Sequence, residues 1–254
     1  MSEGIDELMC NSFKIKSLLH KLPLNRAAGK DGIFAEHIFY ADLSVWNHLS
    51  SLFNVCYAWK NSSGVIVPIC KNKNGNISDA GNYRPVSLAT IISKLFEHYI
   101  LSCISPLLAT TDNQFGFKPK RGTDMCIFLL KQTVSYYVSK GTPVFSAFLD
   151  ASKAFDRTNH NLLFAKLIKR NVPMFIVRLL LSWYRQQTMQ VKWGTNYSSS
   201  FTVTNGVRQG GVLSPYFLLF TWMNSQPAGI NQGGMHCGKY GCESSNVCRW
   251  YMCV

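Results

Sequence analysis

The segment with the sharpest chemical signature is Phe148-Leu-Asp-Ala-Ser-Lys-Ala-Phe-Asp156. The β-branched and aromatic residues from Val144 to Leu149 predict a buried strand that ends directly before Asp150. A carboxylate at a rigid strand end suits Mg²⁺, which prefers oxygen ligands and substrate phosphates in an octahedral shell. An aspartate at such a place is equally typical of a strand-end or helix-capping carboxylate, so this segment alone leaves both interpretations open.

Three other segments offer groups that contact nucleotides or nucleic acid. In the loop Asn205–Pro215, glycines let the backbone approach a ligand closely, while an arginine and a glutamine offer hydrogen-bond donors. In Asn82-Tyr-Arg-Pro85 the proline fixes the direction of the preceding arginine. The segment Asn113–Gly122 interleaves aromatic and basic side chains, as a surface that stacks bases and contacts phosphates does. Each segment is weak evidence alone.

Taken in their order along the chain, these segments resemble the reverse-transcriptase domain of non-LTR retrotransposons. The resemblance covers roughly four-fifths of the chain, and five motifs in the family's order are not expected by chance. The resemblance begins near Lys30-Asp-Gly32, and the five motifs are Val65-Ile-Val-Pro-Ile69, Asn82-Tyr-Arg-Pro-Val-Ser-Leu88, Gln114-Phe-Gly-Phe117, the block at Asp150, and Gly206-Val-Arg-Gln-Gly-Gly211.

The resemblance implies an α+β fold, that of a right-hand polymerase with fingers and a partial palm but no thumb. It also implies two Mg²⁺ ions, an RNA template, a DNA primer and deoxynucleoside triphosphates that are added to the primer 3′ end. On this likeness Asp150 is the catalytic, metal-binding aspartate, and the Ala151 carbonyl is a further ligand. Asp156 belongs to the same motif and is assigned a structural role.

Further roles follow from the same resemblance. Arg84 holds the incoming triphosphate together with Lys71 or Lys73, and Phe155 excludes a ribose 2′-hydroxyl. Gln209 and its glycines line the nucleotide pocket. The full set expected to bind the nucleotide is Arg84, Lys71, Lys73, Ala151, Phe155, Gln209 and Gly210. The set expected to contact nucleic acid is Phe115, Phe117, Lys118, Lys120, Arg121 and Arg208.

The sequence departs from the family after the glycine loop. The family continues into Tyr-Ala-Asp-Asp, which supplies the remaining metal carboxylates, and this block is missing here. The codons for Glu243 to Cys253, read one base later, permit Asn-His-Leu-Met-Tyr-Ala-Asp-Gly-Ile-Cys-Val. We therefore hypothesise that the reading frame slipped between Phe220 and Glu243, leaving a truncated polymerase with an incomplete site for two-metal chemistry.

The tail has a rival interpretation as a zinc site built from His236, Cys237, Cys242, Cys248 and Cys253. Zinc sites favour paired ligands two to four residues apart, and this spacing is irregular, so no zinc is expected. Nine cysteines without secretory-signal features in Met1–Cys10 predict reduced thiols in the cytoplasm or nucleus rather than a secreted protein. No stretch approaches the roughly 18 apolar residues of a membrane span, so no membrane partner is expected.

Composition and charge bound the remaining possibilities. The 254 residues are 47% hydrophobic, enough to bury a core, and 26 Lys and Arg stand against 13 Asp and Glu. This balance favours a polyanionic partner, most commonly nucleic acid, although a basic solvated surface has the same composition. An unrelated basic α/β protein is the residual alternative.

Local patterns predict the elements that position these motifs. We expect an N-terminal helical extension over residues 1–62, incomplete fingers and palm over 63–220, and an irregular, frameshifted tail over 221–254. Predicted helices are Glu7–Leu22, Ile33–Tyr57, Leu88–Leu101 after a break at Arg84-Pro85, Leu162–Lys169 capped by Asn159, and Phe175–Tyr184. The turn residues of Lys71–Asn76, after the strand Val65–Ile69, predict a basic hairpin or loop, and a hairpin is predicted between Met189–Trp193 and Ser200–Thr204.

Three functions are consistent with these patterns. The first is a reverse-transcriptase fragment that is inactive alone. The second is a non-catalytic remnant that binds RNA or an RNA–DNA hybrid. The third is an unstable pseudogene product, because the palm sheet loses the strands that follow the missing motif.

Overall fold

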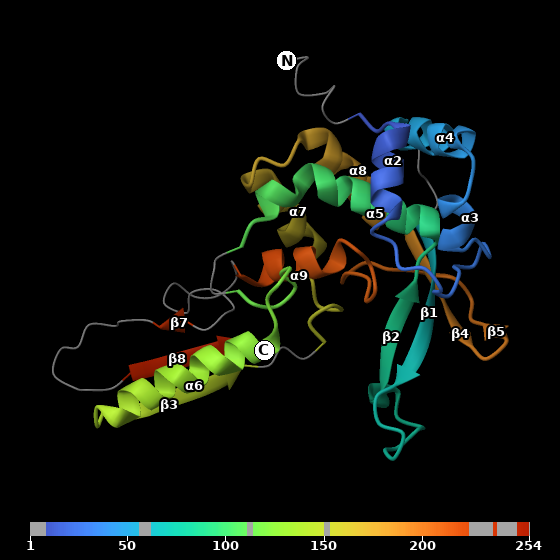
Figure 1. The fold of residues 1–254 in the computed structure, drawn as a ribbon. Coiled ribbons are helices and arrows are strands. Elements are labelled where there is room, and N and C mark those ends of the chain that lie inside the picture. Colours follow the sequence, from blue (N-terminus) through green and yellow to red (C-terminus); the bar gives the residue numbers. More distant parts are fainter. Residues whose placement is uncertain are drawn as a thin grey trace. The chain divides into compact units, whose positions relative to one another are not determined.

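The computed structural model describes residues 9–55, 62–110, 114–149, 153–223, 236–237 and 248–253 (Figure 1). The chain divides into two compact units. The first unit is Met1–Leu107 with Phe155–Ser214, and the second is Leu108–Ala154 with Pro215–Val254. Each unit combines helices with strands, which confirms the expected mixture of both element types.

The first unit contains a mixed sheet of five strands. These strands are β1 (Ser62–Cys70), β2 (Tyr83–Leu88), β4 (Gln187–Trp193), β5 (Asn196–Tyr197) and β6 (Phe201–Thr202). The order is β2-β1-β4-β5, with β6 also on β4; β1 is antiparallel to β2 and parallel to β4. The predicted hairpin of Met189–Trp193 with Ser200–Thr204 is confirmed, and the predicted hairpin or loop after Val65–Ile69 connects the antiparallel strands β1 and β2. The pairing of β1 with β4 joins segments more than a hundred residues apart.

The break predicted at Arg84-Pro85 is wrong, because both residues lie inside β2. Proline lacks the N–H that a central strand needs, but it is tolerated on an edge strand. β2 is such an edge strand, and Pro85 lies opposite Pro68 in the register with β1. The two prolines also lie beyond the β1–β4 ladder, which ends at Ile66.

The described helices of the first unit include α2 (Ser12–Leu19), α3 (Ala35–Phe39), α4 (Leu43–Asn54), α5 (Ile91–Ile104), α7 (His160–Lys169) and α8 (Met174–Arg185). The single helix predicted over Ile33–Tyr57 is wrong, because the Asp42 carboxylate accepts from the Ser44 N–H and begins a new helix. The predicted cap at Asn159 is confirmed by its 3.1 Å bond from the Leu162 N–H.

Helix α5 supplies much of the core of the first unit. Leu95, Phe96, Ile100 and Ile104 are fully buried, and the Phe96 ring lies 5.6 Å from that of Trp183 on α8. With the 3₁₀ turn that follows it, residues Ile91–Leu108 are long and apolar enough for a membrane span by length and composition. The expectation that no stretch reaches that length is wrong here, and the core position accounts for the apolar composition.

The second unit contains helix α6 (Thr123–Ser139), strand β3 (Val144–Leu149) and most of helix α9 (Ser214–Met223). β3 is a strand over the predicted residues, but it is not the buried strand expected, since Phe145 and Phe148 are exposed. The tail holds strands β7 (His236–Cys237) and β8 (Cys248–Cys253), and β8 runs parallel to β3 along its whole length. Sequence periodicity indicated neither tail strand, because strand pairing uses backbone groups that every sequence has.

Candidate nucleotide-binding site

The glycine loop, residues Asn205–Ser214, is tied by its backbone to two other segments of the first unit. Its hydrogen bonds run from Gly206 N–H to Thr158 O (2.8 Å), from Val207 N–H to Phe155 O (2.8 Å), and from Ser87 N–H to Gln209 O (2.7 Å). The first two bonds join the loop to Phe155, at the end of the Asp150 block, and to Thr158, just beyond it. The third joins it to the edge strand β2, so the loop bridges two motifs that lie far apart in the sequence.

Glycine is required at two positions of this loop. Gly206 has φ +85°, and a Cβ there would lie 2.9 Å from the Asp156 Cα. Gly210 has φ +101°, and its Cβ would lie 3.0 Å from the Ser87 carbonyl oxygen. Both residues have a positive φ, which residues with a side chain rarely adopt, and both lie so close to another backbone that a Cβ atom would be crowded.

A buried carboxylate, Glu97, and a buried guanidinium, Arg208, hold the glycine loop against the core of the first unit. Glu97 of α5 is 3% exposed, and its Oε2 accepts from the N–H groups of Val212 (2.5 Å) and Leu213 (3.0 Å). The Arg208 Nη2 lies 3.9 Å from the Glu97 Oε1, and its guanidinium lies 4.9 Å from the centre of the Trp183 ring. The loop is therefore fixed to α5 by charge-assisted bonds and an ion pair, and to α8 by a cation–π contact.

The environment of this pair is strongly desolvated. Among the described residues, Glu97 Oε1 and Trp183 Nε1 are buried without a hydrogen-bond partner. Burial also raises the pKa of the neighbouring Tyr184 hydroxyl well above its usual range. Because a buried charge without its partner is costly, Arg208 and Glu97 depend on each other.

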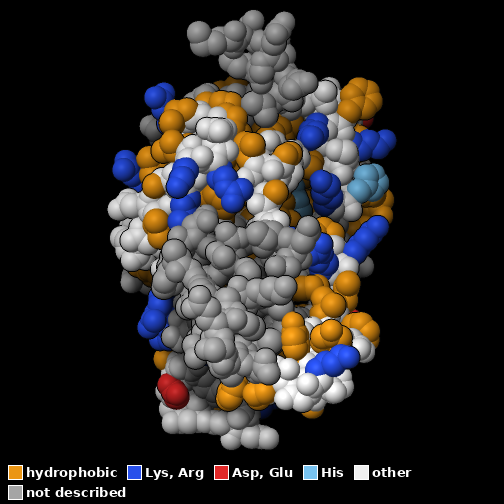
Figure 2. Space-filling model, turned by 90° about the vertical axis from the view of Figure 1, so that its left-hand side faces the viewer, with side chains coloured by type: hydrophobic (Ala, Val, Ile, Leu, Met, Phe, Trp, Pro, Cys, Tyr) orange, Lys and Arg blue, Asp and Glu red, His pale blue; other side chains and the backbone are white. Residues whose placement is uncertain are grey.

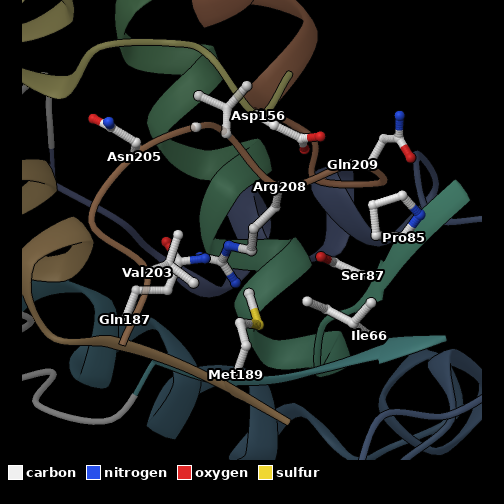
Figure 3. Close-up of a pocket in the computed structure, with 12 residues that line it drawn as sticks. Ile66, Pro85, Ser87, Asp156, Gln187, Met189, Val203, Asn205, Arg208 and Gln209 are labelled. Carbon is white, nitrogen blue, oxygen red and sulfur yellow. The ribbon is translucent and has the colours of Figure 1, made fainter. Parts of the chain in front are cut away.

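A cavity of about 110 Å³ lies between the loop and the sheet (Figure 3). Ile66 and Met189 line it from the sheet, while Asp156 and Gln209 line it from the other segments. Figure 3 shows the Arg208 side chain pointing inward from the loop. The Gln209 Oε1 is buried without a hydrogen-bond partner among the described residues, so this amide oxygen is positioned to accept a bond from a ligand.

The structure brings several of the expected nucleotide-binding residues to β2. Gln209 and Gly210 lie against β2 at Ser87, and Arg84 is an exposed residue of the same strand, three residues away or roughly 10 Å. Phe155 carries the carbonyl that anchors the loop. These residues come from three separate parts of the sequence, and the fold connects them through the glycine loop, which bonds both to Phe155 and to β2.

The lysines of the expected triphosphate site lie on the turn between β1 and β2. The Lys71 Nζ donates to the Gly81 carbonyl oxygen at 2.7 Å, and Lys73 is exposed. Asp150 and Ala151 lie outside the described residues. Among the described residues, no group of three or more His, Cys, Asp or Glu side chains is placed to hold a metal ion.

The residues expected to contact nucleic acid separate into two groups. In the second unit, the Arg121 guanidinium lies 5.6 Å from the Phe115 ring centre, Phe117 and Lys120 are exposed, and the Lys118 Nζ donates to the Thr110 carbonyl oxygen. Arg208 lies in the first unit and is only 7% exposed. Its guanidinium faces Glu97 and Trp183, so its expected contact with nucleic acid stays a prediction.

Glu97 is the residue of this site that sequence patterns missed. It sits in the apolar run of α5, and a lone carboxylate there gave no motif. An acidic residue inside an otherwise buried helical stripe is itself a signal, because such a charge is retained only with partners.

Residues 70–240 match the family described as reverse transcriptase (RNA-dependent DNA polymerase). The chain belongs to the reverse transcriptase family. It is 30% identical over 214 residues to the RNA-directed DNA polymerase from mobile element jockey of Drosophila melanogaster, covering 80% of this chain and 23% of that protein. It is 33% identical over 217 residues to the probable RNA-directed DNA polymerase from transposon X-element of the same species, with the same coverage.

A Pol polyprotein from the type-1 retrotransposable element R2 of Nasonia vitripennis is 25% identical over 205 residues, or 76% of this chain and 19% of that protein. This reverse transcriptase chain thus resembles proteins of non-LTR retrotransposons, and it spans less than a quarter of the length of these relatives. The family implies a metal-dependent polymerase with a nucleic-acid template, a primer and deoxynucleoside triphosphates as substrates.

Proposed function

We propose that this chain forms the fingers and part of the palm of a non-LTR reverse transcriptase and binds an RNA template, a DNA primer and a deoxynucleoside triphosphate. The observation that carries the proposal is the docking of the glycine loop on β2, which places Gln209 and Gly210 against the strand that carries Arg84. An exposed guanidinium, an amide oxygen without a partner and a closely approaching backbone suit a nucleotide.

Each residue has a distinct role in this proposal. Arg84 and Lys73 supply positive charge to the triphosphate from the β1–β2 hairpin, where both are exposed. Gln209 orients the nucleotide through its amide, and the glycine at 210 admits the ligand because it has no side chain. Phe155 lies next to the loop and limits room at the ribose 2′ position.

The donor groups in this sequence do not fit the family's two-metal site. Asp150 and the Ala151 carbonyl are the ligands that the motifs assign, and one carboxylate does not hold two divalent cations. We therefore infer that the chain binds template and nucleotide without extending a primer. Its charge also supports this binding: it carries a net +13, and Figure 2 shows Lys and Arg side chains prevailing over acidic ones among those coloured.

Primer extension on an RNA template with Mg²⁺ tests the inactivity, run beside Asp150→Ala. We expect no extension by either protein, together with RNA binding that weakens as salt rises. Extension that Asp150→Ala abolishes would show that the chain is an active polymerase. A chain that melts without cooperativity and binds no RNA would favour the unstable product instead.

Nucleotide binding tests the assigned pocket. We expect Arg84→Ala to weaken the binding of a deoxynucleoside triphosphate by roughly tenfold, since charge-assisted hydrogen bonds are among the stronger contacts. Arg178→Ala is the matched control, because Arg178 is an exposed arginine on α8. Equal affinities for the two variants would contradict the assignment.

The origin of the tail is tested at the DNA level. We propose that residues 221–254 are read in a slipped frame, so the gene should encode the Tyr-Ala-Asp-Gly string out of phase after codon 220. A genomic sequence without that string would refute the slip. We also propose that the chain divides at residues 62 and 220 into a helical extension, the fingers and palm, and the tail. We further propose that it acts in the cytoplasm or nucleus, where template RNA is found.

A further inference from the structure

The sheet face that lines the cavity continues to a pair of aromatic side chains. Successive side chains of a strand point to opposite faces, so Gln187, Met189 and Trp193 of β4 share one face. The first two line the cavity. On β2, Tyr83 shares a face with Pro85, another lining residue. The Trp193 and Tyr83 rings meet edge to face at 5.3 Å, which agrees with this alternation.

Both strands that carry this aromatic pair are held by backbone pairing, and the larger ring is open to solvent. Trp193 is 59% exposed although tryptophan is among the residues that gain most from burial. Its position is fixed by the Gly194 turn, where φ is +59°, and by pairing with Asn196. The Tyr83 hydroxyl donates to the Ile77 carbonyl oxygen at 2.8 Å, which holds the supporting ring in place.

Positive charge gathers on the other face of the same hairpin, because Lys192 alternates with Trp193 along β4. Lys192 and Lys30 each place Nζ 5.7 Å from the centre of the exposed Tyr197 ring. The Lys30 Nζ also donates to the Gln190 Oε1 at 2.6 Å. The segment 187–204 contains no acidic residue, so a polyanion meets cations and aromatic rings here without a repelling carboxylate from that segment.

We propose that Trp193, supported by Tyr83, stacks an unpaired base of a single-stranded nucleic acid. This surface lies apart from the nucleotide pocket: Trp193 is four residues beyond Met189 on β4, roughly 13 Å along the strand. A single strand is the fitting partner, because a duplex hides its base faces whereas an unpaired base offers a face to any aromatic ring. The inference rests on the proposed function and adds the path of the unpaired template to it.

The experiment measures binding of a fluorescent oligouridine RNA and of a double-stranded RNA of equal length by anisotropy. We expect Trp193→Ala to weaken oligouridine binding by roughly tenfold or more and to leave duplex binding unchanged, because the lost contribution is base stacking. Trp193→Phe should retain most of the affinity, since it keeps an aromatic face. Tyr136→Ala is the matched control, because Tyr136 is also 59% exposed but lies on α6.

The outcomes separate this inference from the function on which it rests. If wild-type protein binds oligouridine and Trp193→Ala binds it equally well, stacking on Trp193 is refuted while the proposed function stands. An equal loss for both RNAs would also refute stacking, since it points to a general disturbance of the surface. If wild-type protein binds neither RNA, the proposed function itself fails. A thermal melt of each variant shows whether it folds. If Trp193→Ala does not fold, the binding of Trp193→Phe tests the stacking instead.

Discussion

The glycine loop of the first unit and helix α6 of the second differ in side-chain burial, and the difference is the opposite of what their compositions indicate. The loop is rich in glycine and polar residues, yet Val207, Arg208 and Leu213 are buried, and Arg208 and Leu213 contact Glu97 of the core helix α5. Helix α6 is rich in apolar residues, yet its described side chains include no buried one. The difference teaches that partners within the unit, rather than hydrophobicity, decide which segment is held in place.

The largest effect is expected from Glu97→Ala. The substitution leaves the Arg208 guanidinium buried without its acid and releases two backbone N–H groups, so unfolding free energy should fall by about 3–5 kcal/mol. Urea denaturation measures the change. Glu97→Gln keeps an acceptor for the N–H groups and should lose less. If both variants were as stable as wild type, the loop would not be held as the structure indicates.

A smaller effect is expected from Gly206→Ala. The Cβ would meet the Asp156 backbone at 2.9 Å in a conformation with positive φ, and such strain costs of order 1–3 kcal/mol. Gly194→Ala is the control, because φ is also positive there but nothing lies within 4 Å of the Cβ. A stability loss in the control as large as that in Gly206→Ala would show that the close approach contributes little.

A still smaller loss of stability is expected when the cap of α7 is removed. Asn159→Ala removes the side chain that accepts from the Leu162 N–H and should lower unfolding free energy by about 1 kcal/mol. Asn159→Asp retains the acceptor and should stay close to wild type in the same denaturation measurement. A larger loss for Asp than for Ala would contradict a capping role.

The smallest effect is expected in α6. Phe128 is exposed, so Phe128→Ala should change unfolding free energy by no more than about 0.5 kcal/mol. The urea midpoint at two protein concentrations provides the measurement. A loss of several kcal/mol, or one that depends on concentration, would show that another surface covers α6 and would remove the contrast with the glycine loop.

Local sequence predicted the elements whose causes are local. The Asn159 cap, the turn residues of Lys71–Asn76 and the β-branched run at Val65–Ile69 act within a few residues, and each prediction is confirmed. Errors arose where a distant partner decides. Pro85 is accepted in β2 because that strand is an edge, and sheet order cannot be seen in the local pattern.

The sequence by itself determined the family, because the order of short motifs survives even where a chain has diverged. It also determined the candidate nucleotide residues by type: arginine, glutamine and glycine. Only tertiary structure decided that Glu97 binds the glycine loop from α5, and that Trp193 shares a face with the cavity. The physical reason is that hydrogen bonds, burial and strand pairing depend on distance in space, and these pairs lie far apart along the chain.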